Sequence, residues 1–147
     1  MTLLIAPLRP QDRDRWNVLA LGYKTFYKTP LPDAEYDKAW QRLLDNDGVF
    51  GLGASLDGQL VGITHYLFHT SIWMKQVCYL QDLFVDPEVR GKGVARALIE
   101  AVAVESRKHT AARLYWMTQE HNTTARTLYD KVAKHHGFIR YDYPMEA

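Results

Sequence analysis

Residues 83–95 read LFVDPEVRGKGVA, and this segment is the most informative part of the sequence. Its apolar run stops at Asp86-Pro87, because proline lacks the amide that a strand needs for its hydrogen-bond ladder. Gly91 and Gly93 then precede a helical pattern. Glycine allows positive φ and close approach of a ligand, and the first amides of a helix have no internal partners. A strand, a glycine loop and a helix start in this order predict a cradle for a phosphate group.

The patterns on either side of this stretch predict a mixed α/β domain. Strands are expected over residues 3–8, 49–56, 59–69, 77–85, 111–118 and 137–143, and helices over 11–27, 33–44, 93–108 and 123–135. Asp57-Gly58 between two apolar runs predicts a hairpin, and Asp12 is a candidate cap for the first helix. Antiparallel strands are therefore expected first, with a parallel crossover later.

Composition limits the class of protein. The chain has 147 residues and a formal net charge of +1, which fits one folded domain over 1–147 and disfavours a strongly basic nucleic-acid coat. Its one cysteine, Cys78, excludes an internal disulfide framework. No apolar run approaches the roughly 18 residues of a membrane helix, and the first residues lack a secretory pattern. We expect a soluble, cytoplasmic protein without a membrane or nucleic-acid partner.

The glycine loop does not fit the common nucleotide sites. A Walker loop needs Ser or Thr after Gly-Lys, whereas Lys92 is followed here by Gly93-Val94. A dinucleotide loop would follow the first strand and carry a third glycine.

The loop instead resembles that of the GNAT superfamily of acetyl-CoA-dependent N-acetyltransferases, which reads Gln/Arg-x-x-Gly-x-Gly/Ala and is matched by residues 90–95. YLQDLFV at residues 79–85 resembles the fourth strand of that family. The branch it resembles most contains the histone-like and polyamine acetyltransferases. The family's second cofactor motif is matched by Asn122, Ala125, Leu128 and Tyr129, followed by Gly137-Phe138.

The resemblance implies a fold and a cofactor site. The fold is α/β, with a mostly antiparallel central sheet of about six or seven strands, about four helices, and fourth and fifth strands that splay apart. The pantetheine arm of acetyl-CoA enters between these strands, and no metal is implied. The implied cofactor-binding residues are Leu83, Phe84, Val85, Arg90, Gly91, Lys92, Gly93, Val94, Ala95, Arg96, Asn122 and Ala125. The alternative is core packing for Phe84 and a helix N-cap for Asn122.

The resemblance also implies that Tyr129 is the general acid. Acyl transfer to an amine expels a thiolate, and a tyrosine with a pKa near 10 can protonate it. The alternative is a tyrosine that packs on the sheet. The spacing from Tyr129 to Gly137 is longer than in many relatives, which predicts that the helix extends by a turn.

The general base is open on sequence grounds, because relatives often carry Glu-Asp where this chain has Gln81-Asp82. Gln81 cannot act as a base. Asp82 can serve through a water if a bulge turns it toward the site. Tyr79, or an amine that arrives less protonated, is the alternative.

The acceptor site is expected between the first two helices and the sheet. The expected substrate-binding residues are Tyr27, Glu35, Tyr66 and Gln81, and the other candidates are Tyr23, Phe26, Trp40 and His65. For any one aromatic of this set, the alternative is plain core packing.

Three functions compete. The first is direct transfer of acetyl to a primary amine, in a small amine, a polyamine or a protein lysine. The alternative is a non-catalytic acyl-CoA sensor, favoured by Gln81 but not by Tyr129. The third is nucleic-acid association through a basic patch, for which the candidates are Arg96, Arg107, Lys108 and Arg113. A homodimer is expected through an exposed sheet edge.

Overall fold

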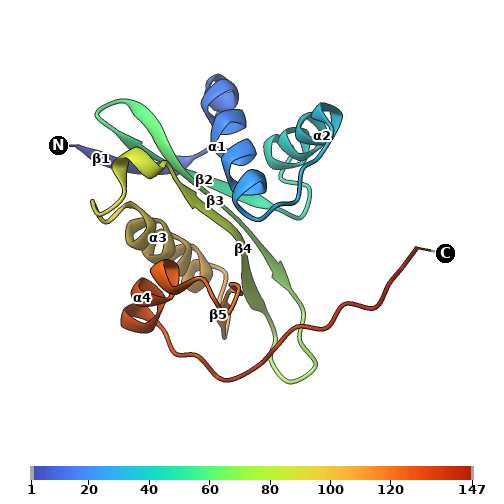
Figure 1. Ribbon diagram of the computed structural model, residues 1–147. Helices are drawn as coiled ribbons and strands as arrows, with labels where there is room; N and C mark the ends of the chain where they lie inside the picture. Colours follow the sequence, from blue (N-terminus) through green and yellow to red (C-terminus); the bar gives the residue numbers. More distant parts are fainter. Residues whose placement is uncertain (1, 147) are drawn as a thin grey trace. The chain divides into compact units, whose positions relative to one another are not determined.

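The computed structural model describes residues 2–146 and divides into two compact units. The first unit ends at Met117 and contains the sheet with helices α1, α2 and α3 (Figure 1). The second begins at Thr118 and contains helix α4.

The first unit is built on a five-stranded sheet in the order β1-β2-β3-β4-β5. The strands are β1 (Leu3–Pro7), β2 (Phe50–Leu56), β3 (Gln59–His69), β4 (Val77–Val85) and β5 (Leu114–Tyr115). The helices of the chain are α1 (Arg13–Phe26), α2 (Asp33–Leu44), α3 (Val94–Lys108) and α4 (Thr123–Val132), with short 3-10 turns η1 (Pro10–Asp12) and η2 (Pro87–Val89). Neighbouring strands are antiparallel from β1 to β4, and β4 pairs with β5 in parallel. This confirms the expected mixed α/β class.

The hairpin between β2 and β3 forms where the sequence predicts it. Asp57 and Gly58 have φ values of 50° and 87°, so both turn residues adopt the left-handed conformation. Such a turn matches the twist of the flanking strands, and it pairs Leu56 with Gln59.

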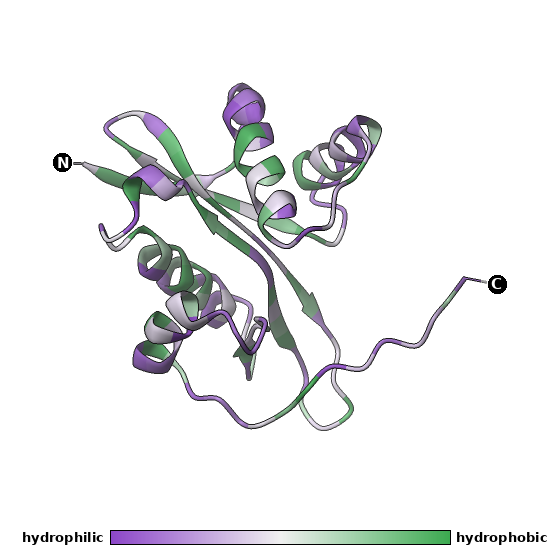
Figure 2. Ribbon diagram, viewed as in Figure 1, coloured by the Kyte–Doolittle hydropathy of each residue, from purple (hydrophilic) through white to green (hydrophobic). Residues whose placement is uncertain are grey.

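Helices cover both faces of the sheet in the first unit. Figure 1 shows α1 and α2 on one side and α3 on the other, and Figure 2 shows hydrophobic residues along the central strands between them. The buried face of α3 carries Val94, Leu98 and Val102, as its spacing predicts. Neighbouring residues of β3 serve opposite layers. An added Cβ at Gly62 would meet Val94 of α3, whereas Ile63 belongs to the cluster under α1.

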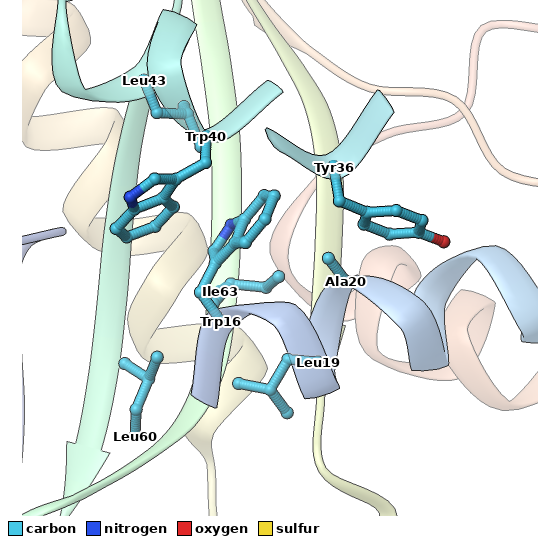
Figure 3. Close-up of a cluster of buried hydrophobic side chains, with 8 residues drawn as sticks. All are labelled: Trp16, Leu19, Ala20, Tyr36, Trp40, Leu43, Leu60 and Ile63. Atoms are coloured by element: carbon cyan, nitrogen blue, oxygen red, sulfur yellow. The ribbon is translucent and has the colours of Figure 1, made fainter. Parts of the chain in front are cut away.

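The core under α1 and α2 centres on two tryptophans (Figure 3). The rings of Trp16 and Trp40 have centroids 4.9 Å apart, and the guanidinium of Arg13 lies 5.9 Å from the Trp16 centroid. The buried members are Trp16, Leu19, Ala20, Tyr36, Trp40, Leu43, Leu60 and Ile63. Because large rings interlock here, the relative positions of α1, α2 and β3 are well determined by packing.

Three expectations near the C-terminal end are wrong. The sheet has five strands, not six or seven, and residues 137–143 do not form a strand within the described residues. The strand expected over 111–118 is reduced to the two residues of β5, and α4 ends at Val132 rather than extending by a turn. An alternating pattern can suggest a strand, but only a partner with free backbone groups makes one. Ala133 adopts an extended conformation and so ends α4.

The N-terminal cap of α1 also differs from expectation. The Asp12 carboxylate accepts the backbone N–H of Arg9 at 2.8 Å, so it caps η1 instead of α1. Within residues 2–146, no helix is long and apolar enough to cross a membrane.

Tyr36→Phe should not destabilise the protein. Tyr36 is 6% exposed, and its hydroxyl has no hydrogen-bond partner among the described residues. Figure 3 shows this hydroxyl pointing away from Trp16 and Trp40. A buried, unpaired polar group costs about 1–3 kcal/mol, so removing it should leave the free energy of unfolding unchanged or raise it. Urea unfolding measures this, and Tyr36→Ala, which also removes the ring, should cost about 3–5 kcal/mol. A clear loss of stability in Tyr36→Phe would contradict the packing described.

Candidate functional site

A bulge in β4 turns Asp82 toward the α1 layer. His65 of β3 pairs with Asp82, but the next residue, Tyr66, pairs with Leu80, so Gln81 is one extra residue in β4. An extra residue changes the face on which the following side chains lie. The structure therefore contains the bulge that an Asp82 role requires.

The contacts of β4 show this change of face directly. Before the bulge, Cys78 contacts Ser106 of α3. After it, Phe84 lies against α1, where an added Cβ at Gly22 would come within 2.9 Å of the Phe84 ring. Without the extra residue, Cys78 and Phe84 would share a face, because they are an even number of positions apart.

Asp82 lies at one end of a chain of partly buried hydrogen bonds. His65 Nδ1 is 2.9 Å from Asp82 Oδ2, and the indole nitrogen of Trp16 donates to His65 Nε2 at 2.9 Å. Tyr23 also hydrogen-bonds to Asp82. The side chain of His65 is 13% exposed and that of Asp82 is 22% exposed. Residues from α1, β3 and β4 thus hold one carboxylate that still reaches solvent.

This environment keeps Asp82 ionised. Burial opposes the charged form, but it is outweighed by the hydrogen bond and electrostatic attraction from His65, the hydrogen bond from Tyr23 and the positive charge of Lys24. The pKa of Asp82 therefore lies below its usual range. For Tyr23, burial and the Asp82 charge both raise the pKa of the phenol, so its hydroxyl stays protonated and donates. The arrangement presents a fixed negative charge that can receive an ammonium group.

The end of β4 is anchored to α1 and β3. Asp86 Oδ1 accepts the Glu88 N–H at 3.0 Å, and Asp86 Oδ2 lies 3.3 Å from Arg15 Nη2. Arg15 Nε also donates to the Leu60 carbonyl at 3.0 Å. These bonds fix the point where the glycine loop begins.

The glycine loop has the geometry that an anion cradle needs. Gly91 and Gly93 have φ values of 81° and 78°, and an added Cβ at either would meet no atom within 4 Å. Gly93 is the N-cap of α3, whose first turn contains no acidic residue. The positive end of the helix is therefore not neutralised by its own carboxylates. Arg96 pairs with Glu100 at 3.1 Å, which leaves Arg90 and Lys92 as the loop's exposed cations.

The edge of β4 opens beyond its short contact with β5. Their pairing joins Cys78 to Leu114 and Tyr79 to Tyr115, and β5 ends there. In the part of the chain that the structure describes, Leu80–Val85 therefore have no strand partner on that edge. The gap includes Leu83 and Val85, whose backbone groups are the expected cofactor contacts.

The remaining predicted substrate residues lie in different places. Gln81 is exposed at the bulge, and Tyr27 packs against Tyr23 with ring centroids 4.8 Å apart. Glu35 is in the first turn of α2, where it pairs with Lys38 at 3.2 Å. The structure thus brings Gln81 and Tyr27 next to members of the Asp82 chain.

Tyr66 lies in the other layer. Its ring stacks on Phe50 at 5.6 Å, and burial, followed by the nearby Glu105 of α3, raises the pKa of Tyr66 to about 12. Its neighbour His65 faces α1, because adjacent residues of a strand point to opposite faces of the sheet. Its substrate role remains a prediction, which this location does not support.

Tyr79, the alternative base, stacks on Tyr115 with centroids 5.0 Å apart. The Tyr115 hydroxyl lies 3.0 Å from His69 Nε2. This aromatic group lies where β4 and β5 pair, before the bulge. Among the described residues, no group of three His, Cys, Asp or Glu side chains could hold a metal ion.

The second unit carries the other predicted residues on α4. Asn122 is its N-cap, and its Oδ1 accepts the Ala125 N–H at 3.4 Å. Tyr129 lies further along the helix and is half-buried. The cofactor role of Asn122 and Ala125 and the acid role of Tyr129 remain predictions.

Trp16 was not a functional candidate on sequence grounds. Its helical spacing with Leu19 and Ala20 predicts a core residue, and it is one. Its bond to His65 joins residues 49 positions apart, which no local pattern reveals.

Comparison with known proteins identifies the family. The model of the "Acetyltransferase (GNAT) family" matches residues 16–138. The chain belongs to the GNAT acetyltransferase family. This GNAT protein is therefore an acetyl-CoA-dependent N-acetyltransferase, as the glycine loop predicts.

Relatives and solved structures agree with this assignment. The D-amino-acid N-acetyltransferase HPA3 of Saccharomyces cerevisiae is 33% identical over 135 residues, covering 89% of this chain and 84% of that protein. A thialysine N-epsilon-acetyltransferase of Caenorhabditis elegans is 30% identical over 60% of this chain and 56% of that protein. In fold, AAC(6')-Iy in complex with a CoA-containing bisubstrate analogue matches with a TM-score of 0.88 at 18% identity, with each chain fully covered.

The contribution of Asp82 to the free energy of unfolding should vary with pH. The folded pKa of Asp82 lies below the ordinary value of about 3.9, so the ionised group stabilises the fold above that value. This contribution is lost as the pH falls through the folded pKa. Urea unfolding at a series of pH values should show a wild-type advantage over Asp82→Asn at pH 7 that shrinks below about pH 4.

Asp142→Asn provides the matched control, because the Asp142 side chain is 71% exposed. Its pH curve should run parallel to that of the wild type. Parallel curves for Asp82→Asn as well would show that Asp82 is not held ionised by the fold.

Proposed function

We propose that the protein transfers acetyl from acetyl-CoA directly to the primary amine of a small acceptor, and that Asp82 receives the acceptor's ammonium group. The observation that carries this is the ionised, partly exposed Asp82 carboxylate at the bulge, beside the open edge of β4. The names of the relatives support a small amine, since they specify D-amino acids and thialysine. A polyamine and a protein lysine present the same nucleophile and are the alternatives. We place the reaction in the cytoplasm, because the lone Cys78 implies no internal disulfide.

In this mechanism Asp82 binds the ammonium and accepts its proton through a water. A carboxylate with a lowered pKa is a weak base, so the proton passes on to solvent while the charge keeps the amine in place. The amine nitrogen then attacks the thioester carbonyl, the new C–N bond forms and the C–S bond breaks. Tyr129 protonates the departing thiolate, and it regains a proton from the water that takes up the second proton released by the acylated nitrogen. Gln81, Tyr27 and Glu35 line the acceptor's approach.

We propose that the chain acts as one acetyltransferase domain over 1–147 and that its cofactor contacts are as follows. The free amides at the start of α3, with Arg90 and Lys92, bind the pyrophosphate. The backbone of Leu83 and Val85 bonds the pantetheine arm as an added strand would, with Phe84 beside it. The remaining cofactor contacts in this proposal are Gly91, Gly93, Val94, Ala95, Arg96, Asn122 and Ala125.

A panel of amines tests the function. Acetyl-CoA is offered with D-amino acids, a lysine analogue, a polyamine and a lysine peptide, and the released thiol is measured. We expect thiol release with small amines and little with the peptide. Release with the peptide alone would assign a protein acceptor. Tight acetyl-CoA binding with no release on any amine would favour the sensor alternative.

Gly93→Asp should abolish acetyl-CoA binding. A carboxylate at the start of α3 would occupy the position of the phosphate and repel its negative charge. No atom lies within 4 Å of a Cβ added at Gly93, so the substitution causes no steric clash. Calorimetry measures the affinity. Gly48→Asp is the matched control, because Gly48 has a φ of 74° and is equally open, but lies in the turn before β2. Equal affinities in the two folded variants would remove this loop from the cofactor site.

Tyr129→Phe should fold and bind acetyl-CoA normally but turn over about a hundredfold more slowly, because only the proton donor is lost. The loss should shrink with a thioester whose thiol is more acidic. Tyr143→Phe, in the exposed tail, serves as the control. Unchanged turnover with chemistry rate-limiting would exclude Tyr129 from the mechanism.

We also propose that the protein forms a homodimer through residues 138–143. The side chains of Phe138, Ile139, Tyr141 and Tyr143 are 74–88% exposed, and an exposed apolar segment of this kind suits contact with a second copy. Light scattering should give the mass of a dimer. The double variant Ile139→Lys, Tyr141→Lys should give a monomer, whereas Glu146→Lys should remain a dimer. A monomeric wild type would refute the proposal.

A further inference from the structure

We propose that Trp16 and His65 are positioning residues for the acceptor amine. The indole N–H of Trp16 fixes one tautomer of His65, and that tautomer holds the Asp82 carboxylate in the orientation that receives the ammonium group. The inference rests on the proposed function of Asp82, and it extends the site into the core between α1 and α2.

The tautomer follows from the donors available. An indole nitrogen can only donate, so His65 Nε2, at 2.9 Å from it, must accept and carries no proton. The ring proton is then on Nδ1, which donates to Asp82 Oδ2 at 2.9 Å. In the opposite tautomer, the N–H at His65 Nε2 would face the indole N–H of Trp16. The unprotonated Nδ1 would then face the Asp82 carboxylate, so neither hydrogen bond would form. Trp16 therefore controls the bond to Asp82 without touching it.

Trp16 itself has little freedom. It is 2% exposed, and its ring packs against Trp40 at 4.9 Å (Figure 3). The centroid of the His65 ring lies 5.9 Å from that of Trp16. Because buried rings in a close-packed core cannot swing without displacing neighbours, the indole N–H is a fixed reference for the site.

Asp82 keeps capacity for a ligand after these bonds are made. A carboxylate offers about four lone-pair positions. His65 occupies one on Oδ2 and Tyr23 provides a second donor, so positions remain for an ammonium. Two fixed donors also hold the plane of the carboxylate, which sets the direction from which the ammonium approaches.

The first test is Trp16→Phe, which keeps an aromatic ring against Trp40 but removes the N–H together with part of the indole. We expect kcat/KM for the amine to fall about tenfold, mostly through KM, with the affinity for acetyl-CoA unchanged. Trp40→Phe is the matched control, because it also removes an indole N–H from this pair of rings. Both ring nitrogens of His65 already have partners, so Trp40 is not in the chain and its variant should change kcat/KM less than twofold.

The second test separates the two halves of the chain. In His65→Asn, the amide can stand where Nδ1 stood and still donate to Asp82. In His65→Gln, the longer side chain reaches the place of Nε2 and accepts from Trp16, but it loses the donor to Asp82. We expect His65→Asn to keep more activity on the amine than His65→Gln. The reverse order would overturn the proposal, since a purely structural role would favour the side chain that satisfies the buried indole.

Nitrogen-15 NMR reads the tautomer without any turnover. Long-range proton–nitrogen spectra of the free protein should show His65 protonated at Nδ1 only, and Trp16→Phe should lose this single form. A proton on Nε2 in the wild type would overturn the proposal, as would an unchanged KM for the amine in Trp16→Phe. If the wild type acetylates no amine, the proposed function fails, and the spectra still decide whether Trp16 fixes His65.

Discussion

The extra residue at Gln81 determines what the rest of the first unit can do. It ends one alternation of side chains along β4 and starts another, so that a carboxylate is directed to the layer of α1 while earlier residues pack under α3. A carboxylate so placed is costly to bury unless donors meet it. Tyr23 and His65 provide these donors, and both lie on elements that the tryptophan core fixes. The bulge, the hydrogen bonds to Asp82 and the packing of α1 on the sheet therefore depend on one another.

In the proposed function, the same strand contributes to both the cofactor site and the acceptor site. Its backbone edge lies open past the short pairing with β5, and its last residues lead to the glycine loop, where the positive end of α3 is left without acidic neighbours. Backbone groups and helix amides do not depend on side-chain identity, so they suit a ligand that is always the same. In the proposed function the side chains on the α1 face bind the acceptor, and the relatives differ in the acceptors that their names specify, D-amino acids and thialysine.

The sequence predicted the features that depend on near neighbours. Asp57-Gly58 sets the hairpin because both residues adopt positive φ, and the bounds of α2 and β4 follow from local periodicity and from Pro87. It failed for residues 137–143, because a strand needs a distant partner and no local pattern shows whether one is there. The side of the sheet on which Asp82 lies depends on the extra residue in β4 relative to β3, which the alternation of side chains alone cannot reveal. The Trp16 bond was missed for the same reason, since a buried tryptophan at helical spacing looks like core.

The packing of Trp16 against Trp40 bears on how the protein can change by mutation as well as on how α1 and α2 fold over the sheet. In the proposed function, a substitution that moves the Trp16 indole would change the orientation of Asp82 and leave the loop before α3 untouched. If the proposed positioning role holds, changes in this hydrophobic core alter acceptor preference with no change at the reacting atoms. Under this proposal, related proteins can change their amine acceptor while they keep the same acetyl donor. The substitutions responsible would then lie at buried core positions.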